Sequence, residues 1–229
     1  METNSVLQSG CSTVLKPGYY VAGYDFAAGI VDIHVLRGSI GNLMSTNRNV
    51  GGIGEVISFA SSDPRYYNKD FYGINMPRGT QLLVDCFEAA IVWNSDFSPI
   101  LRTYAYDRSR VLTGGKYRVG TSIEPGFYDA ELISGYANIG VFDQGAGRFN
   151  SASIGLQFED DYPVPKFKNI LLCTGDELEI TDISMMTYDM LKNNPNNNMV
   201  MPDPTRVRLI KCTSNIVFNE YGINNFRIN

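Results

Sequence analysis

The chain has 229 residues, 44% of them hydrophobic and 19% charged, with a formal net charge of −5, a balance typical of a globular protein with a core of its own. Because no basic stripe interrupts this acidic composition, we expect binding neither to nucleic acid through its phosphates nor to anionic membrane surfaces. No apolar run approaches the ~20 residues of a membrane span, so we expect no membrane insertion.

The N-terminal segment, residues 1–5, is polar and lacks the basic and apolar regions of a signal peptide. We therefore expect no signal peptide in this chain, and a location in the cytoplasm or on a particle. The four cysteines, Cys11, Cys86, Cys173 and Cys212, lack the close spacing of metal ligands. They do not occupy equivalent places in the repeat described below, and we expect free thiols in a reducing compartment.

Strand patterns dominate the rest of the chain, and no stretch carries a convincing amphipathic helical pattern. Residues 30–36 alternate, with Val31 and Ile33 on one face and Asp32 and His34 on the other. Further strands are expected over residues 19–21, 54–59, 82–84, 87–93, 100–106, 153–158, 178–180, 206–211 and 215–219.

The sequence is repeated. Residues 14–23 return as residues 111–120, and the register then holds through Asp32 and Asp129. Further blocks match in the same order: 38–43 with 134–139, 71–74 with 167–170, and 79–84 with 175–180. A period near one hundred residues is the size of a small domain rather than of a solenoid repeat. Shared alternation in the two copies indicates that they bury the same face of each strand.

These patterns predict an all-β protein of two tandem, duplicated β-sandwich or jelly-roll-like domains. The first copy spans residues 1–97 and the second spans 98–192, followed by an asparagine-rich loop and a C-terminal β extension over 193–229. The extension is too short to fold alone, so its strands are expected to join a sheet of the second copy or to return across the first. Residues 185–192 coincide with a strand of the first copy, which favours strand over a short helix there.

The segment 19–29 (YYVAGYDFAAG) resembles a Y-x-V-G-x-D-I-P-A-G-x-Y motif. That motif occurs in an uncharacterised, often tandem family of small β-domains from Gram-positive bacteria and their mobile elements. Residues 41–42 and 51–56 are similar to the G-N and G-G-I-N-E-V elements of the same family, and residues 117–128 keep the first motif with Ser122 in place of its aspartate. The resemblance covers about residues 12–190 and implies a β-rich domain without an established activity.

The residues offer little chemistry for catalysis. His34 is the single histidine and has no cluster of metal-binding or catalytic side chains beside it in the sequence. No nucleophile elbow, catalytic triad or phosphate-binding glycine loop is present. Asp32 and Asp129 can form a pair of catalytic carboxylates only if the two copies pack face to face. An aspartate near a tight turn more often accepts hydrogen bonds from backbone amides. We therefore predict no enzyme, no cofactor and no metal, with an enzyme between the two copies as the least favoured alternative.

Aromatic residues suggest recognition instead, because exposed tyrosine provides a large contact area at low entropic cost. Adjacent carboxylates in residues 159–161 can help to hold calcium, although a solvated turn explains them as well. The candidate binding residues are Tyr66, Tyr67, Tyr72, Tyr162, Asp160 and Asp161.

The sequence therefore predicts a non-catalytic binding or assembly module for a protein or glycan ligand, including another copy of the same chain. A structural protein of a phage particle or of a cell surface is the alternative. The specific function is expected where the two copies differ, in the loops over residues 44–70 and 142–166, in the asparagine-rich loop and in the tail.

Overall fold

A computed structural model describes residues 11–59, 68–93, 104–142, 153–156, 164–183, 203–214, 216–217 and 227–228. Every regular element in this part of the chain is a β-strand, which confirms the predicted all-β class. No helix among the described residues has the length and apolar character required to cross a membrane. The chain divides into two compact units, Met1–Arg102 and Thr103–Asn229, called unit 1 and unit 2 below.

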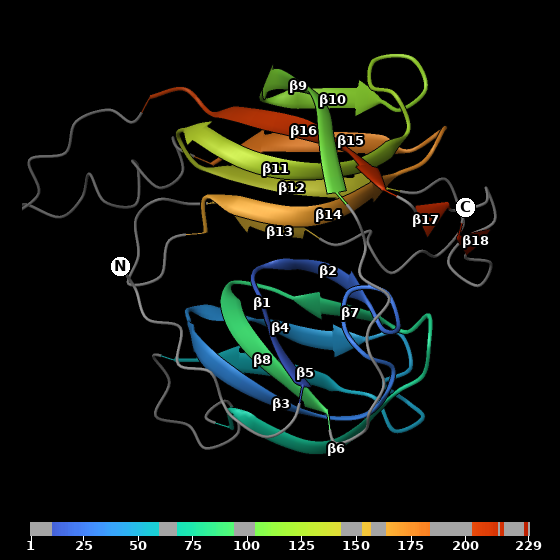
Figure 1. The fold of residues 1–229 in the computed structure, drawn as a ribbon. Helices are drawn as coiled ribbons and strands as arrows, with labels where there is room; N and C mark the ends of the chain where they lie inside the picture. Colours follow the sequence, from blue (N-terminus) through green and yellow to red (C-terminus); the bar gives the residue numbers. More distant parts are fainter. Residues whose placement is uncertain are drawn as a thin grey trace, which may run out of the picture. The chain divides into compact units, whose positions relative to one another are not determined.

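The eight strands of unit 1 form a sandwich of two antiparallel layers with four strands in each (Figure 1). Its strands are β1 (Cys11–Leu15), β2 (Gly18–Val21), β3 (Gly29–Gly38), β4 (Ile40–Ser45), β5 (Gly54–Ser58), β6 (Asp70–Met76), β7 (Gln81–Val84) and β8 (Phe87–Trp93). One sheet has the order β1-β8-β3-β6 and the other has the order β5-β4-β7-β2. Consecutive strands alternate between the two sheets except for β4 and β5, which pair with each other, and this order is that of an eight-stranded jelly roll.

The core of unit 1 contains the face of β3 that the sequence pattern predicted. Val31, Ile33 and Val35 are buried there, together with Phe26 and Phe87. Burial of one such side chain stabilises the fold by ~1.5–3 kcal/mol. The apolar face of β3 therefore holds the two sheets of the sandwich together.

Unit 2 repeats this architecture. Its strands are β9 (Tyr104–Thr113), β10 (Gly115–Arg118), β11 (Gly126–Ser134), β12 (Ala137–Phe142), β13 (Ser153–Leu156), β14 (Lys166–Leu172), β15 (Glu177–Asp182) and β16 (Arg206–Ser214), followed by the short antiparallel pair β17 (Ile216–Val217) and β18 (Arg227–Ile228). The sheet orders are β9-β16-β11-β14 and β13-β12-β15-β10. Strand by strand this is the order of unit 1, with β9 in the place of β1 and β16 in the place of β8. The match agrees with the sequence repeat, while the origin of the two units by duplication stays a prediction.

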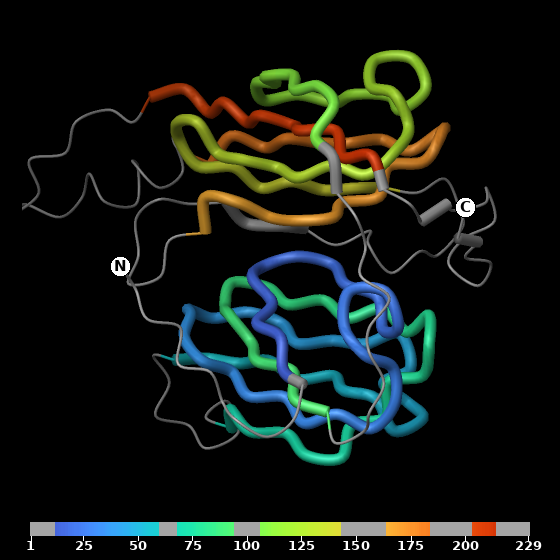
Figure 2. Tube along the Cα trace, viewed as in Figure 1, coloured from blue at the N-terminus to red at the C-terminus, as the bar shows by residue number. Residues whose placement is uncertain are grey.

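β16 is an interior strand of unit 2. It pairs with β11 on one side and with β9 on the other, and in Figure 2 its red trace runs beside the yellow-green trace of β11. Val207 and Leu209 of β16 are buried in the core. β16 therefore takes the first of the two placements that the sequence allowed for the tail, whereas β17 and β18 pair only with each other. The strand expected over residues 185–192 and the asparagine-rich loop lie outside the described residues.

The turn between the second and third strands has the same form in both units. Gly23 and Gly120 have φ angles of +81° and +93°, a left-handed backbone that glycine adopts without steric cost. The amide of Gly23 donates to the carbonyl oxygen of Phe26 at 2.6 Å, and the amide of Gly120 donates to that of Ile123 at 2.7 Å. In unit 2 this turn forms one wall of the candidate site.

Candidate functional site

Of the six binding residues predicted from the sequence, only Tyr72 lies among the described residues. Tyr72 is on β6, is 68% exposed, and meets the ring of His34 edge-on with ring centroids 5.7 Å apart. The Nδ1 atom of His34 lies 2.7 Å from a carboxylate oxygen of Asp70. These three side chains form a small polar cluster on the outer face of the first sheet. The other predicted residues, Tyr66, Tyr67, Asp160, Asp161 and Tyr162, lie outside the described residues.

The repeated aspartates are part of the scaffold. Asp32 accepts a hydrogen bond from the backbone amide of Gly73 at 2.8 Å, and Asp129 accepts one from that of Asn169 at 3.0 Å. The prediction that these carboxylates bind backbone amides is thereby confirmed in both units.

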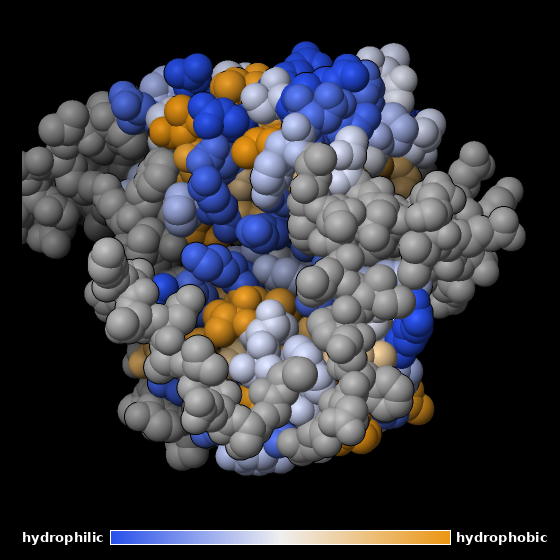
Figure 3. Space-filling model, in the orientation of Figure 1, coloured by the Kyte–Doolittle hydropathy of each residue, from blue (hydrophilic) through white to orange (hydrophobic). Residues whose placement is uncertain are grey.

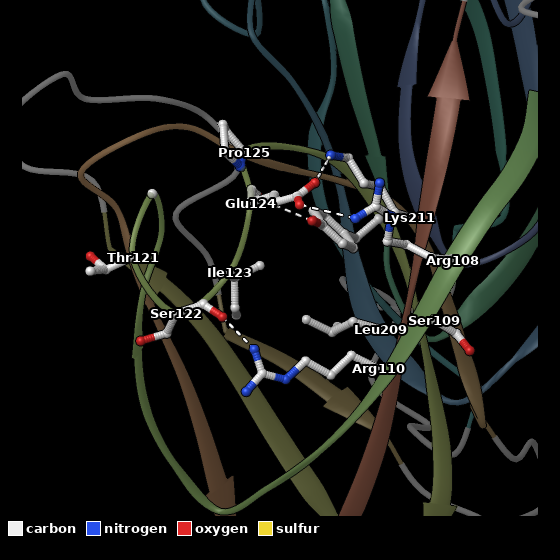
Figure 4. Close-up of a pocket in the computed structure, with 12 residues that line it drawn as sticks. Arg108, Ser109, Arg110, Thr121, Ser122, Ile123, Glu124, Pro125, Leu209 and Lys211 are labelled. Carbon is white, nitrogen blue, oxygen red and sulfur yellow. Dashed lines mark hydrogen bonds and ion pairs between the residues drawn. The ribbon is translucent and has the colours of Figure 1, made fainter.

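A pocket of about 400 Å³ lies within unit 2 (Figure 4). It is lined by residues of β9, of the β10–β11 turn, of β11 and of β16: Arg108, Ser109, Arg110, Gly120, Thr121, Ser122, Ile123, Glu124, Pro125, Tyr128, Leu209 and Lys211. This volume lies within the ~300–1,000 Å³ of typical small-molecule sites.

Strand register places the pocket at an open end of the sandwich. Arg110 of β9 pairs with Leu209 of β16, and two residues further along Leu112 pairs with Val207. Leu112, Val207 and Leu209 are buried. Because side chains alternate along a strand, Arg110 projects from the same face as the core residue Leu112. On the core-facing side of β9, the cation Arg110 therefore lies next to the last apolar core residue, Leu112.

The pairing of strands also identifies the residue of unit 1 that corresponds to the pocket residue Lys211 of unit 2. Lys211 of β16 pairs with Tyr128 of β11, whereas Trp93 of β8 pairs with Val31 of β3. The sequence repeat matches Val31 with Tyr128. Trp93 therefore occupies in unit 1 the position that Lys211 occupies in unit 2.

Aromatic side chains fill this end of unit 1. Trp93 is 3% exposed, Tyr24 is 4% exposed, and Phe26 is fully buried. The repeat places Thr121 and Ile123 of unit 2 in the positions of Tyr24 and Phe26. A lysine, a threonine and an isoleucine thus replace a tryptophan, a tyrosine and a phenylalanine, and all three line the pocket of unit 2.

Charge is organised within the pocket around Glu124. One oxygen of this carboxylate accepts a hydrogen bond from Nζ of Lys211 at 2.7 Å, and the other lies 3.1 Å from a guanidinium nitrogen of Arg108. Arg108 also contacts Asp107 at 3.3 Å. The hydrogen bond from Lys211 and the charge of Arg108 hold the pKa of Glu124 below its usual value. Two of the three cations that line the pocket are therefore paired.

Arg110 is placed differently. Its guanidinium donates to the carbonyl oxygen of Ser122, as the dashed line in Figure 4 shows. Within the described part of the chain no carboxylate lies within ion-pair distance of Arg110. Ile123 and Leu209 contribute apolar side chains to the lining of the same pocket, and Figure 4 shows both near Arg110.

Tyr128 is a buried residue of the pocket lining. Its hydroxyl donates to the carbonyl oxygen of Glu124 at 2.7 Å, and the residue is 6% exposed. Burial, with the nearby charge of Glu124, raises the pKa of Tyr128 to about 12. A phenol with this pKa stays protonated at neutral pH, so Tyr128 orients the turn rather than exchanging protons.

The lining combines cations, one carboxylate, hydroxyl groups and aliphatic side chains. It contains neither histidine nor cysteine, and among the described residues no group of three or more metal-binding side chains forms a cluster. A planar cation, a paired carboxylate, hydroxyl groups and an apolar wall together suit a compact polar ligand.

Comparisons with protein-family models, with curated proteins and with solved structures gave no match. The geometry of unit 2 is therefore the ground for a functional proposal.

Sequence reasoning did not identify the pocket residues Arg108, Arg110, Glu124 and Lys211. A signal was present in the repeat itself, where Ala27 of the first copy is matched by Glu124 and Phe26 by Ile123. Ala27 is buried, whereas Glu124 is exposed, so this replacement indicates that the surroundings of the position differ between the two units.

Proposed function

We propose that this protein is a non-catalytic binding module and that a negatively charged small ligand, or a charged group of a glycan or protein, enters the pocket of unit 2. The observation that carries the proposal is the difference between equivalent ends of two sandwiches. Unit 1 is filled by Trp93 and Phe26, whereas unit 2 has Arg110 and Lys211 around an open cavity. The pocket has three cations and one carboxylate in a chain whose net charge is −5.

Fold alone does not choose between the alternatives, because jelly rolls occur in lectins, cupins and viral capsids. The pocket supports a binding module over a purely structural protein of a phage particle or cell surface, since assembly needs no charged cavity. On the face seen in Figure 3, hydrophobic residues lie in small groups separated by hydrophilic ones. This distribution supports recognition in a cavity over docking on a broad apolar surface.

The engagement of Asp32 and Asp129 with backbone amides supports a non-catalytic role. Each carboxylate accepts a hydrogen bond from a neighbouring strand within its own unit, which is a structural role.

A fragment screen by nuclear magnetic resonance tests the proposal. The ¹⁵N-labelled full chain is titrated with matched sets of anionic, neutral and cationic small molecules. We expect anionic members to shift the amide resonances of Thr121, Ser122 and Lys211, while those of Trp93 and Phe26 stay in place. Shifts at the pocket from cationic members alone, or from no member of any set, would overturn the proposal.

A further inference from the structure

The anion in the pocket can be specified further, an inference that rests on the proposed function. The first step concerns the backbone of the β10–β11 turn. All four amides of residues 120–123 donate within the turn, to the carbonyl oxygens of Ile123 and Arg118. Phosphate-binding loops bind a tetrahedral anion through a concave group of backbone amides that point toward the anion. Because these amides are engaged, recognition of an anion falls to side chains.

The second step concerns Arg110. A guanidinium is planar and offers parallel N–H donors that match the two oxygens of a carboxylate. One terminal nitrogen of Arg110 is held by the carbonyl oxygen of Ser122, which fixes the plane of the group. Because this contact with the turn already positions the Arg110 side chain, its remaining N–H donors can bind a ligand with little further loss of side-chain entropy.

The third step concerns the opposite side of the pocket. Glu124 lies between Lys211 and Arg108 at 2.7 and 3.1 Å, so a second anion placed there would meet a carboxylate. The same carboxylate can accept hydrogen bonds from hydroxyl groups. The two sides of the pocket therefore select opposite properties: an anion beside Arg110 and hydrogen-bond donors beside Glu124.

We infer that the pocket of unit 2 binds a sugar acid, whose carboxylate pairs with Arg110 and whose hydroxyl groups donate to Glu124. Ile123 and Leu209 supply the apolar wall against which the C–H face of a sugar ring packs. A pocket of about 400 Å³ accommodates one such residue, free or at the end of a glycan.

Three pyranoses that share the same ring and differ at C6 test this inference: glucuronate with a carboxylate, glucose with a neutral hydroxymethyl group, and glucose 6-phosphate with a phosphate. Each is titrated into the ¹⁵N-labelled full chain, and dissociation constants are taken from the shifts of Thr121 and Ser122. We expect glucuronate to bind at least about tenfold more tightly than glucose, the effect of one charge-assisted pair. Glucose 6-phosphate is expected to bind more weakly than glucuronate, since the turn offers it no amides.

Variants of Arg110 separate its planar geometry from its charge. Arg110→Lys keeps the positive charge and loses the planar pair of N–H donors, so the affinity for glucuronate should fall on the order of tenfold. Arg110→Gln should remove the preference for glucuronate over glucose. Arg206→Gln is the matched control, because Arg206 is an exposed cation on the same strand as Lys211 and does not line the pocket. An unchanged amide spectrum away from the pocket shows that each variant is folded.

Equal binding of glucuronate and glucose 6-phosphate, or equal loss in Arg110→Lys and Arg206→Gln, would overturn the sugar-acid assignment. Neither result contradicts the proposed function, which is overturned only if no anionic fragment shifts the resonances of the pocket residues. If other anions shift them and glucuronate does not, the assignment is wrong and the binding module stands.

Discussion

The carboxylate of Asp129 accepts a hydrogen bond from the backbone amide of Asn169 at 3.0 Å, at the place where β11 and β14 shift register. Asp32 and Gly73 make the same contact at 2.8 Å where β3 and β6 shift register. Gly73 and Asn169 have φ angles of +67° and +62°. Each unit thus contains a β-bulge whose outward-turned amide is satisfied by an aspartate of the neighbouring strand.

Replacing Asp129 tests the energetic value of this contact. Asp129 is 8% exposed, and Asp129→Ala leaves the buried amide of Asn169 without this acceptor. We expect the free energy of unfolding of unit 2 to fall by ~1–3 kcal/mol, measured by urea denaturation with circular dichroism. Asp129→Asn retains an acceptor oxygen and should lose less. Asp32→Ala should also lose less, because its hydrogen bond is exposed; equal losses in all three variants would contradict the bulge interpretation.

The ion pairs around Glu124 predict how unit 2 responds to acid. The pKa of Glu124 is lowered in the folded protein, first by the hydrogen bond from Lys211 and then by the charge of Arg108. A carboxyl whose folded pKa lies below its unfolded value stabilises the fold fully above the unfolded pKa, and this contribution is lost as pH falls through the folded pKa.

We therefore expect Glu124 to titrate below the ordinary glutamate range of about 4.5 in a carbon-detected carboxyl titration. Lys211→Met removes the first cause of the shift and should raise the pKa of Glu124 toward that value. Lys116→Met is the control, because Lys116 is paired with Glu177 on β15 and has no contact with Glu124. A Glu124 pKa that stays low in Lys211→Met would mean that Arg108 alone holds the carboxylate charged.

The filled end of unit 1 predicts a large cost for removing its tryptophan. Trp93 is 3% exposed, and Trp93→Ala leaves a cavity that the surrounding strands cannot close completely. The expected loss in the free energy of unfolding is ~3–5 kcal/mol for unit 1, followed by circular dichroism in urea. Trp93→Phe retains an aromatic ring, and in the described part of the chain Nε1 of Trp93 has no hydrogen-bond partner. Trp93→Phe should therefore cost much less; similar losses in the two variants would show that the ring does not fill this end.

The alternating pattern of β3 could be read from the sequence because Val31, Ile33 and Val35 all face one core. The bounds of β9 could not be predicted from the sequence. The sequence favours a strand over residues 100–106, whereas the structure has Tyr104–Thr113. Residues 107–110 (DRSR) are polar at every position. They belong to a strand because β9 is an edge strand that pairs with β16 on one side only within its sheet.

The pocket depends on that same pairing, which is why the sequence alone did not reveal it. Arg110 and Lys211 are about one hundred residues apart in the chain. They line one cavity because β16 lies between β9 and β11, and because the register between β16 and β9 shifts between Ile210 and Cys212. No local pattern encodes a register between distant strands.

Cys212 provides a chemical probe of the face opposite the pocket. It is 4% exposed and packs with Phe127 and Leu171. Burial, followed by the charge of Asp129, raises the pKa of the Cys212 thiol to about 12. Since the thiolate is the reactive form, its population at pH 8 should be about a thousandfold below that of a thiol with the ordinary pKa of 9.0.

We therefore expect iodoacetamide to label Cys212 very slowly in the native protein at pH 8, and at an ordinary rate in urea, as measured by mass spectrometry of the peptide that contains it. Asp129→Asn removes the second cause of the shift while keeping an acceptor for the amide of Asn169. It should accelerate native labelling by less than unfolding does, because burial is the larger cause. Native labelling as fast as that in urea would place the thiol in solvent and would contradict the packing of β16 against β11.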